Sequence, residues 1–362
     1  MCTLCKHLDT SRIDAFGERL LGILNSGGLA LLISLGHRTG LLDAMAKLPP
    51  STSGEIAKAA GLNERYVREW LGGMLAGRIV DYSPDENTWS LPAEHAALLT
   101  RAASPNNIAA FMQYIGCLGM VEDRIVECFK RGGGVPYSGF DRFHEVMAED
   151  SGQTVVAALF DHIIPLVPGL HEKLEAGIEV LDLGCGRGIA IRQMAMRYPQ
   201  SRFTGIDFSD EAIAWAKEQA SNDNLVNLRY EAADAAKVDF EPRFDLITTF
   251  DAIHDQARPD IVLSRIARAL KPDGIYLMQD IHASSRPHLN MDHPAGALLY
   301  TVSTMHCMTV SLAQGGMGLG TMWGRELAQK MLAEAGFGSV EIKRLAHDFQ
   351  NDYYIIRHHA QD

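Results

Sequence analysis

One segment of the chain combines an acidic residue with closely spaced glycines in a pattern suited to a nucleoside-bearing ligand. Residues 180–188 read VLDLGCGRG, an apolar run that leads into Gly184, Gly186 and Gly188. Glycines where a strand turns into a helix let the backbone bend sharply and let a ligand approach the main chain. Asp207 ends the next apolar run, where an open α/β sheet places a carboxylate that accepts ribose hydroxyls. The pattern therefore predicts a nucleoside site at the ends of two strands.

Two further apolar runs also end in residues that could do chemistry. Asp234 follows the third run, and the fourth leads into FDAIHDQ at residues 250–256. His254 lies in that segment, and the ordinary pKa of histidine suits proton transfer near neutral pH. We interpret His254 as a candidate general base, while a structural or cofactor-edge role for the same histidine remains open.

The elements that must position these residues are strand-length apolar runs, which alternate with amphipathic helices after residue 177. Such alternation predicts an α/β fold, a parallel sheet with helices on both faces. Because ligands of such sheets bind at the carboxyl ends of the strands, the residues above should gather at one edge. A long insertion at 283–323 should cover that edge as a lid. The expected strands are 179–183, 203–206, 226–230, 246–250, 275–278, 340–345 and 353–356.

The first hundred residues predict a winged helix. A short helix at 51–60 and a second one at 64–77 precede two apolar runs, 79–82 and 88–91, which flank a polar turn typical of a β-hairpin. The second helix should bury one stripe of its surface. That stripe consists of Tyr66, Val67, Trp70, Leu71, Met74 and Leu75.

The apolar stretch that precedes the winged helix, 15–46, is predicted to form two helical segments broken at Gly27-Gly28 and at Gly36. The chain as a whole then divides into three parts. We expect a winged-helix and dimerisation domain at 1–104, connecting helices at 105–172, and a catalytic domain at 173–362 that carries the lid.

Residues 178–281 resemble the class I S-adenosylmethionine-dependent methyltransferases. DLGCGRG, which begins at Asp182, is similar to their first motif, and GIDFS, from Gly205, to their second. AADA, from Ala232, and ALKPDG, from Ala269, stand at the places of later motifs. The glycine spacing differs from the Gly-x-Gly-x-x-Gly of dinucleotide dehydrogenases. The whole chain resembles a bacterial methyltransferase group with an N-terminal winged helix, which is similar to small-molecule O-methyltransferases.

This resemblance implies a Rossmann-like, seven-stranded sheet and S-adenosylmethionine as the cofactor, with S-adenosylhomocysteine as its product. It also implies a role for each motif residue. Asp182 would support the glycine turn and the amino group of the cofactor, Gly184 and Gly186 would face its methionine part, and Gly188 completes the motif. Asp207 would hold the ribose, Phe208 would cover the adenine, Asp234 with the amide of Ala235 would contact the adenine edge, and Phe250 with Asp251 would border the sulfonium.

The reaction that fits best is methyl transfer to a hydroxyl of a small molecule, with His254 as the base. Plant-type O-methyltransferases carry His-Asp-Trp at a similar place, whereas this chain has Gln256 as the third residue, so the match is partial. A thiol, thioether or amine acceptor is an alternative that needs no base. A third hypothesis is a winged-helix transcriptional regulator that senses the cofactor.

Composition limits the possible partners. The formal net charge is −12, and 47% of the residues are hydrophobic, which excludes a disordered chain and a general binder of nucleic acid. In the second winged-helix helix, two acidic and two basic residues between Glu64 and Glu69 cancel. Six cysteines are too few for a disulfide framework, and the apolar stretch 20–35 is short for a membrane span. We expect a cytoplasmic homodimer that uses its N-terminal domain, with neither nucleic acid nor membrane as partner.

No metal site is predicted. Cys2, Cys5 and His7 have the spacing of half a zinc site, but no second pair follows. Scattered histidines and a Met-rich helix in and near the lid more plausibly line or close a pocket, and ordinary packing is an equal alternative. The residues concerned are His282, His288, His293, Met305, His306, Cys307 and Met308, with Asp161 and His162 as similar candidates before the fold.

Overall fold

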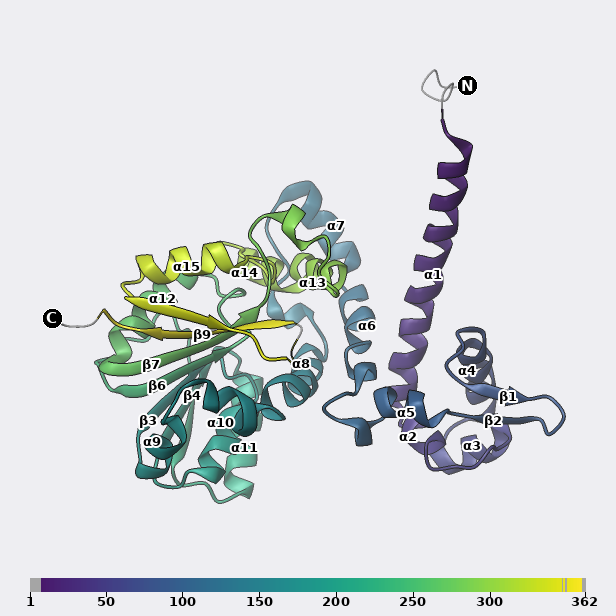
Figure 1. Cartoon of the computed structure of the whole chain (residues 1–362), viewed down its shortest axis with the longest axis horizontal. Coiled ribbons are helices and arrows are strands. Elements are labelled where there is room, and N and C mark those ends of the chain that lie inside the picture. The colour runs from purple at the N-terminus through teal and green to yellow at the C-terminus, as the bar shows by residue number, and fades with distance from the viewer. Residues whose placement is uncertain (1–7, 347, 349, 360–362) are drawn as a thin grey trace. The chain divides into compact units, whose positions relative to one another are not determined.

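The computed structural model describes residues 8–346, 348 and 350–359 (Figure 1). The chain divides into two compact units, Met1–Gly116 and Cys117–Asp362, so most of the expected connecting segment belongs to the second unit. The half zinc motif at Cys2, Cys5 and His7 lies outside the described residues.

The first unit is mainly helical and contains one small antiparallel hairpin. Its strands pair Tyr82 with Trp89, as the predicted wing requires. The elements are α1 (Thr10–Arg38), α2 (Leu41–Met45), α3 (Ser53–Ala60), α4 (Glu64–Ala76), β1 (Asp81–Ser83), β2 (Thr88–Ser90), α5 (Ala93–Leu99), η2 (Arg101–Ala103) and η3 (Ile108–Ala110), and α6 (Gln113–Gly119) crosses into the second unit.

The long helix α1 corrects the sequence prediction. It runs unbroken from Thr10 to Arg38 through glycines that were expected to interrupt it. Gly36 serves close packing instead, because a Cβ there would lie 2.6 Å from the indole of Trp70. By length and composition α1 could cross a membrane, a test that core helices of soluble proteins also pass. The expectation that this stretch is too short for a span therefore does not hold.

Helices α3 and α4 form where the sequence predicts them. Thr52 and Glu55 cap α3 reciprocally, as a capping box does. On α4, Trp70 is buried and its Nε1 donates to the carbonyl oxygen of Leu32 at 2.8 Å. Tyr66 and Leu75 are errors in the predicted stripe, since 80% and 37% of them are exposed. The remaining buried members of the stripe are Val67, Leu71 and Met74.

The second unit is built on a seven-stranded sheet with the order β5-β4-β3-β6-β7-β9-β8. Its first five strands are parallel, while β9 runs antiparallel to both β7 and β8. This confirms the predicted fold. The strands are β3 (Glu179–Leu183), β4 (Arg202–Asp207), β5 (Leu228–Ala232), β6 (Phe244–Phe250), β7 (Leu270–Ile281), β8 (Ser339–Lys343) and β9 (Asn351–Arg357).

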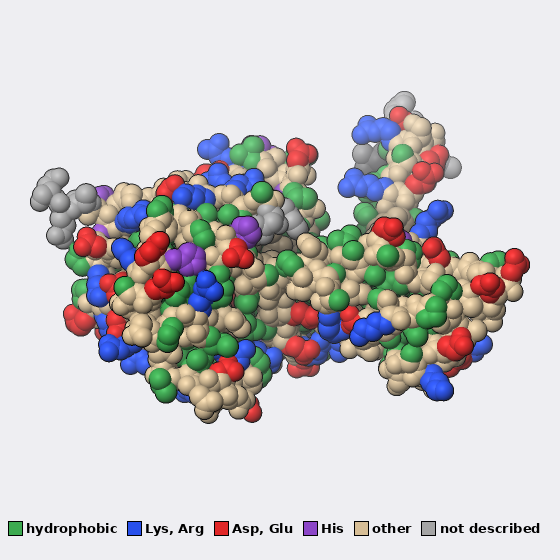
Figure 2. All heavy atoms as spheres, turned by 60° about the horizontal axis from the view of Figure 1, so that its bottom comes forward, with side chains coloured by type: hydrophobic (Ala, Val, Ile, Leu, Met, Phe, Trp, Pro, Cys, Tyr) green, Lys and Arg blue, Asp and Glu red, His purple; other side chains and the backbone are tan. Residues whose placement is uncertain are grey.

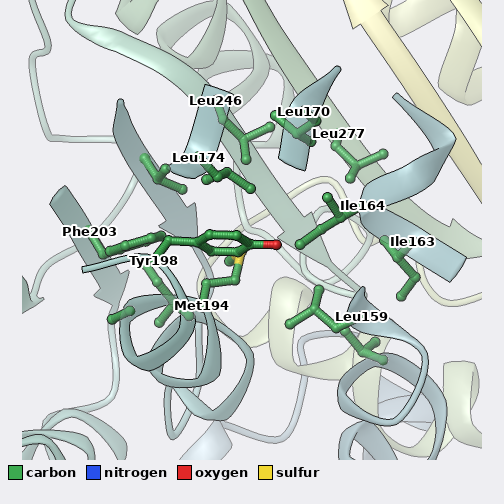
Figure 3. Close-up of a cluster of buried hydrophobic side chains, with 14 of the residues drawn as sticks. Leu159, Ile163, Ile164, Leu170, Leu174, Met194, Tyr198, Phe203, Leu246 and Leu277 are labelled. Carbon is green, nitrogen blue, oxygen red and sulfur yellow. The ribbon is translucent and has the colours of Figure 1, made fainter. Parts of the chain in front are cut away.

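Helices cover both faces of this sheet (Figure 1). On one face α9 (Leu170–Ala176), α10 (Ile189–Arg197) and α11 (Asp210–Asn222) bury a cluster around Tyr198 and Phe203 (Figure 3). On the other face α12 (Pro259–Ala269) and α15 (Arg325–Glu334) pack against the sheet. With both faces covered, the carboxyl edge of the parallel strands is left as the place for a ligand.

Two helical segments complete the second unit. The first precedes the sheet, and the second is the insertion after β7 that was expected to form a lid. The elements before the sheet are α7 (Glu122–Arg131), η4 (Tyr137–Gly139), α8 (Phe143–Ser151), η5 (Gly152–Val156), η6 (Leu159–Ile163) and η7 (Ile164–Leu166). The insertion contains η8 (Pro287–Asn290), α13 (Gly296–Val302), the π-helical turn η9 (Ser303–Cys307) and α14 (Met308–Ala313).

Candidate active site

The glycine loop after β3 adopts a backbone that side chains would disturb. Gly184, Gly186 and Gly188 have φ of +72°, +53° and +66°, the left-handed region that glycine enters without strain. A Cβ at Gly184 would lie 2.4 Å from Ala252, and one at Gly188 would lie 2.4 Å from the ring of Tyr230. Around Gly186 nothing lies within 4 Å of such a Cβ. The loop is therefore packed from below at its two ends and open at its centre, where a ligand can reach the main chain.

Asp207 ties this loop to the end of β4. Its Oδ2 accepts the amide of Gly186 at 2.9 Å, and its Oδ1 accepts the amide of Ser209 at 2.9 Å. Burial raises the pKa of Asp207 despite these bonds. Each oxygen keeps a free lone-pair direction, so the carboxylate is fixed in place and can still accept two hydroxyls of a ribose.

Asp182 lies below the loop in the sheet. Its Oδ1 accepts the hydroxyl of Thr248 at 2.8 Å, and the side chain is buried. Burial raises its pKa to about 7. A buried carboxylate with one neutral partner favours a cationic ligand nearby, because a positive charge would offset its lost hydration.

A cavity of about 330 Å³ opens beyond the ends of β4 and β5, lined by Phe208 and Ala232 among others. Phe208 and Tyr137 lie at its wall with their ring centroids 5.2 Å apart, and Asp234 lines it as well. Asp234 Oδ1 accepts the amide of Ala236, and its Oδ2 pairs with Lys237. Ala235 packs into the apolar core under α12. The roles given to Asp234 and Ala235 thus stay predictions, although Asp234 does lie in the cavity.

His254 is buried just past β6, and its Nδ1 lies 2.8 Å from Oδ1 of Asp280 at the end of β7. The same oxygen also accepts the amide of Ile281 and Nε1 of Trp323, at 2.8 and 3.0 Å. Burial alone lowers the pKa of His254, but the Asp280 carboxylate and Cys307 outweigh it and raise that pKa well above 6.5. Asp280 therefore fixes the ring and its tautomer, and Nε2 is left to the side of Cys307, which also bonds His254.

The insertion after β7 is docked directly on the segment that carries His254. The amide of Gly320 donates to the carbonyl oxygen of His254 at 3.1 Å, and Ser311 Oγ donates to that of Gln256 at 2.8 Å. On its other side Thr309 Oγ1 accepts the amide of Val135 at 2.8 Å. This supports the expected lid, since the insertion holds His254 in a buried position.

The histidines of the insertion do not gather around a metal. His282 bonds the buried Asp352, which also pairs with Arg325, and His293 accepts the amide of Ala295. His288 is exposed, as are Asp161 and His162 before the fold. His306 is buried among rings, with its imidazole stacked 3.4 Å from Phe143. Burial lowers the pKa of His306 well below 6.5.

One group in the described part of the chain could offer three ligand atoms to a metal ion: Asp251, His254 and Asp280, whose ligand atoms lie within 4.8 Å of one another. The Nδ1 of His254 and the Oδ1 of Asp280 already bond each other. Burial and the charge of Asp280 raise the pKa of Asp251. We therefore interpret the His254–Asp280 pair as a proton-transfer site with Asp251 beside it, and the expected lack of a metal stays a prediction.

The structure adds residues that sequence reasoning missed. Asp280 could have been predicted in the same way as Asp207, because it too lies at the carboxyl end of a parallel strand, where ligands bind. Phe250, which the resemblance places at the sulfonium, lies partly buried against the core at the end of β6, and its predicted role stays a prediction. Trp323 and Tyr137 carry no sequence signal for their places, because long-range packing of loop segments positions them.

Two family models match the chain. Residues 27–101 match the Rv2258c-like winged HTH domain, and residues 174–336 match a methyltransferase domain. Among curated proteins, the chain is 29% identical over 105 residues to the fatty-acid O-methyltransferase of Mycolicibacterium smegmatis, covering 29% of this chain and 37% of that protein. It is 29% identical over 125 residues to the ubiquinone biosynthesis O-methyltransferase of Neisseria meningitidis, covering 34% and 52%. The chain thus spans about a third to a half of the length of these relatives.

Solved structures of other proteins share the fold of this chain over nearly its whole length. The mitomycin 7-O-methyltransferase superposes with a TM-score of 0.70 at 17% identity, over 96% of this chain and 100% of that one. Human N-acetylserotonin methyltransferase in complex with SAM gives 0.67 at 17% identity, over 99% of each chain. At such identities the likeness shows the fold.

The fold and the site define a methyltransferase domain of the class I type, preceded by a winged helix. The N-terminal part is similar to the Rv2258c-like winged HTH domain over residues 27–101, and the part that follows it to a methyltransferase domain over residues 174–336.

Proposed function

We propose that this protein transfers a methyl group from S-adenosylmethionine to a hydroxyl of a small molecule. The observation that carries the proposal is the His254–Asp280 pair, buried at the same sheet edge as the glycine loop and Asp207. The His254–Asp280 pair supports a base at this edge, and the glycine loop with Asp207 supports a nucleoside site. Methyltransferase relatives and the methyltransferase family model support the same reaction.

The residues present fit this cofactor. The open space above Gly186 and the free lone pairs of Asp207 suit the methionine part and the ribose. Phe208 would cover the adenine at the cavity wall, and Asp182 would favour the cationic end. When bound, the cofactor supplies a methyl group on a sulfonium, a strong electrophile with a neutral leaving group.

His254 would act through Nε2. Because Nδ1 is held by the Asp280 carboxylate, Nε2 is the ring nitrogen that would take the acceptor's proton once the acceptor displaces Cys307 from it. The raised pKa of His254 favours the protonated imidazole near neutral pH. Only the fraction of molecules whose imidazole is neutral can accept the proton of the acceptor. The activity is therefore expected to rise with pH until His254 is deprotonated.

Burial of His254 beneath the docked insertion excludes water from the reacting atoms. Exclusion of water matters because the methyl group of the sulfonium is already electrophilic. The enzyme therefore has to align the bound hydroxyl with that methyl group and keep water away, more than to activate the methyl group further. A thiol, thioether or amine acceptor stays the alternative. For such an acceptor, loss of the His254 imidazole would leave turnover nearly intact.

We also propose a cytoplasmic homodimer formed through the N-terminal domain. Helix α1 exposes a row of large apolar residues, Ile13, Phe16, Leu20, Leu21, Ile23 and Leu24, each at least half exposed, which a second subunit would cover. Size-exclusion chromatography with light scattering tests this: a monomer, or binding of the protein to anionic lipid vesicles through α1, would contradict it.

We do not propose nucleic acid as a partner. On α4, Arg65 pairs with Glu69 and Arg68 with Glu64, so the helix that would enter a groove is neutralised by its own acids. The face drawn in Figure 2 shows acidic and basic side chains interspersed. A salt-sensitive, sequence-specific shift of DNA by the protein would favour the cofactor-sensing regulator instead.

The proposed reaction is tested with S-adenosylmethionine labelled in its methyl group and a panel of phenols, thiols and amines. We expect label in a methyl ether, and binding of S-adenosylhomocysteine by calorimetry. Asp207→Ala should abolish that binding, while Asp273→Asn, an exposed change outside the site, should not alter it. Failure of the wild-type protein to bind either form of the cofactor would overturn the proposal.

A further inference from the structure

Buried polar atoms without hydrogen-bond partners gather beside His254. They are Oδ1 of Asp251, both polar side-chain atoms of Gln279, and Oδ2 of Asp280. The amide of Gln279 lies close enough to Asp251 to act on the pKa of that carboxyl, which it lowers, but it leaves Oδ1 of Asp251 without a partner. Gln279 and Asp280 are fully buried. The strand pairing places Gln279 opposite Phe250, and the amide of Asp251 donates to the carbonyl oxygen of Gln279 at 3.1 Å. Since an unpaired buried polar atom costs stability, this concentration indicates a ligand that pairs them.

The backbone at Asp251 points the same way. Its φ is +51°, a left-handed conformation that residues other than glycine rarely adopt. Strain of this kind persists where the surroundings fix it, often at functional sites. Asp251 therefore holds its carboxyl group beside His254 and Asp280, with ligand atoms of the three side chains within 4.8 Å of one another.

The unpaired atoms define the chemistry of the missing group. Two carboxyl groups and one amide offer both donors and acceptors within a small space. A hydroxyl both donates and accepts, so it can pair with Asp251 and with the amide of Gln279 whether or not Asp251 carries a proton. A purely apolar acceptor would leave all of these atoms unpaired.

An aromatic cluster lies near His254, whose charge helps to lower the pKa of His306 in that cluster. The ring of His306 stacks on Phe143, and its edges meet Tyr137 at 4.9 Å and Phe140 at 4.6 Å between centroids. The turn η9, which carries His306, is held near His254 through Gly320. The amide of that glycine bonds the His254 carbonyl oxygen, and a Cβ on it would lie 2.2 Å from Ser303 Oγ. Flat rings pack well against such a wall.

We propose that Asp251 and Gln279 hold a second hydroxyl of the acceptor, next to the hydroxyl that His254 deprotonates, and so select aromatic vicinal diols. This rests on the proposed methyl transfer and adds a specificity determinant to it. Asp251 is a binding residue in this account, and the proton moves to His254 alone. The oxygen it leaves forms the new bond to the methyl carbon as the carbon–sulfur bond of the cofactor breaks.

Asp251→Asn is the decisive variant. Asparagine tolerates the left-handed backbone better than other non-glycine residues, so the fold should be kept, and the melting temperature checks this. The probes are catechol and phenol, each titrated by calorimetry into the complex of the protein with S-adenosylhomocysteine. Asp273→Asn, an exposed change in the same unit, is the matched control, and Gln279→Met is a second variant that removes the amide.

The wild type and Asp273→Asn should bind catechol about 10-fold or more tighter than phenol, in line with a hydrogen bond to a charged group. Asp251→Asn and Gln279→Met should lose most of that difference and leave phenol binding unchanged. Equal binding of the two probes by the wild type, or an equal loss for both in Asp251→Asn, would overturn the inference while methyl transfer itself could stand. If S-adenosylhomocysteine does not bind, both the inference and the proposed function fail.

Discussion

The Nδ1 of His254 and the Oδ1 of Asp280 lie 2.8 Å apart, and both side chains are buried. They come from the ends of neighbouring strands, β6 and β7, so the sheet itself sets their spacing. Trp323, the last residue of the insertion, donates its Nε1 to the same oxygen. A pair fixed from three directions is suited to orient a base rather than to let it move.

Asp280→Asn should lower the pKa of His254, because the carboxylate is what raises it above its ordinary value. A base is active only when deprotonated, so activity falls as pH drops through the pKa of His254. In the variant that acid limb of the profile of kcat/KM against pH should move to lower pH. Maximal turnover should fall about 10-fold or more, because the ring loses its fixed tautomer. An acid limb that stays in place would show that another group controls it.

Asp182→Asn should stabilise the free protein. Burial raises the pKa of Asp182 from 3.8 to about 7 in the folded protein. Between these two pH values, the carboxyl group is ionised in the unfolded chain but still protonated in the folded chain. Folding stability is lost over that window as pH rises. The amide oxygen can still accept the Thr248 hydroxyl. We expect a gain of about 2–4 °C in Tm at pH 8, shrinking toward pH 4, together with weaker cofactor binding. An equal gain in Tm at pH 8 and at pH 4 would show that the protonation of Asp182 does not control this stability.

Gly186→Ala should weaken S-adenosylhomocysteine binding by about 10-fold or more, because the new methyl group enters the open space above the loop. Gly133→Ala is the matched control. Gly133 also has a positive φ, +79°, and open surroundings, but it lies outside the site. Both variants should lose similar stability, about 1 kcal/mol. Equal cofactor affinities in calorimetry would place the ligand elsewhere.

Much of this site was predictable because it follows strand ends. The alternation of apolar runs and helices predicted the sheet, and the carboxyl ends of its strands then placed Asp182, Asp207 and His254 at one edge. β7 is longer than predicted because the Lys-Pro-Asp-Gly run, which indicates a turn, lies within the strand beyond a register shift at Phe244 and Leu246.

Other features depended on contacts between distant segments. The glycines of α1 looked like helix breakers, whereas Gly36 makes room for Trp70. Tyr66 looked like part of the buried stripe by spacing alone, yet no element covers that side of α4 in the described chain. His306 gave no signal beyond its type, because Phe143 and Tyr137 reach it from a segment far away in the sequence.

The most direct test of the account is the turnover of His254→Gln with catechol and labelled S-adenosylmethionine, measured beside the affinity of the same variant for S-adenosylhomocysteine. Glutamine keeps the size and polarity of the side chain but cannot take the proton. The account predicts turnover reduced by about 100-fold or more, with cofactor affinity within about 3-fold of the wild type. Unchanged turnover at unchanged affinity would contradict it.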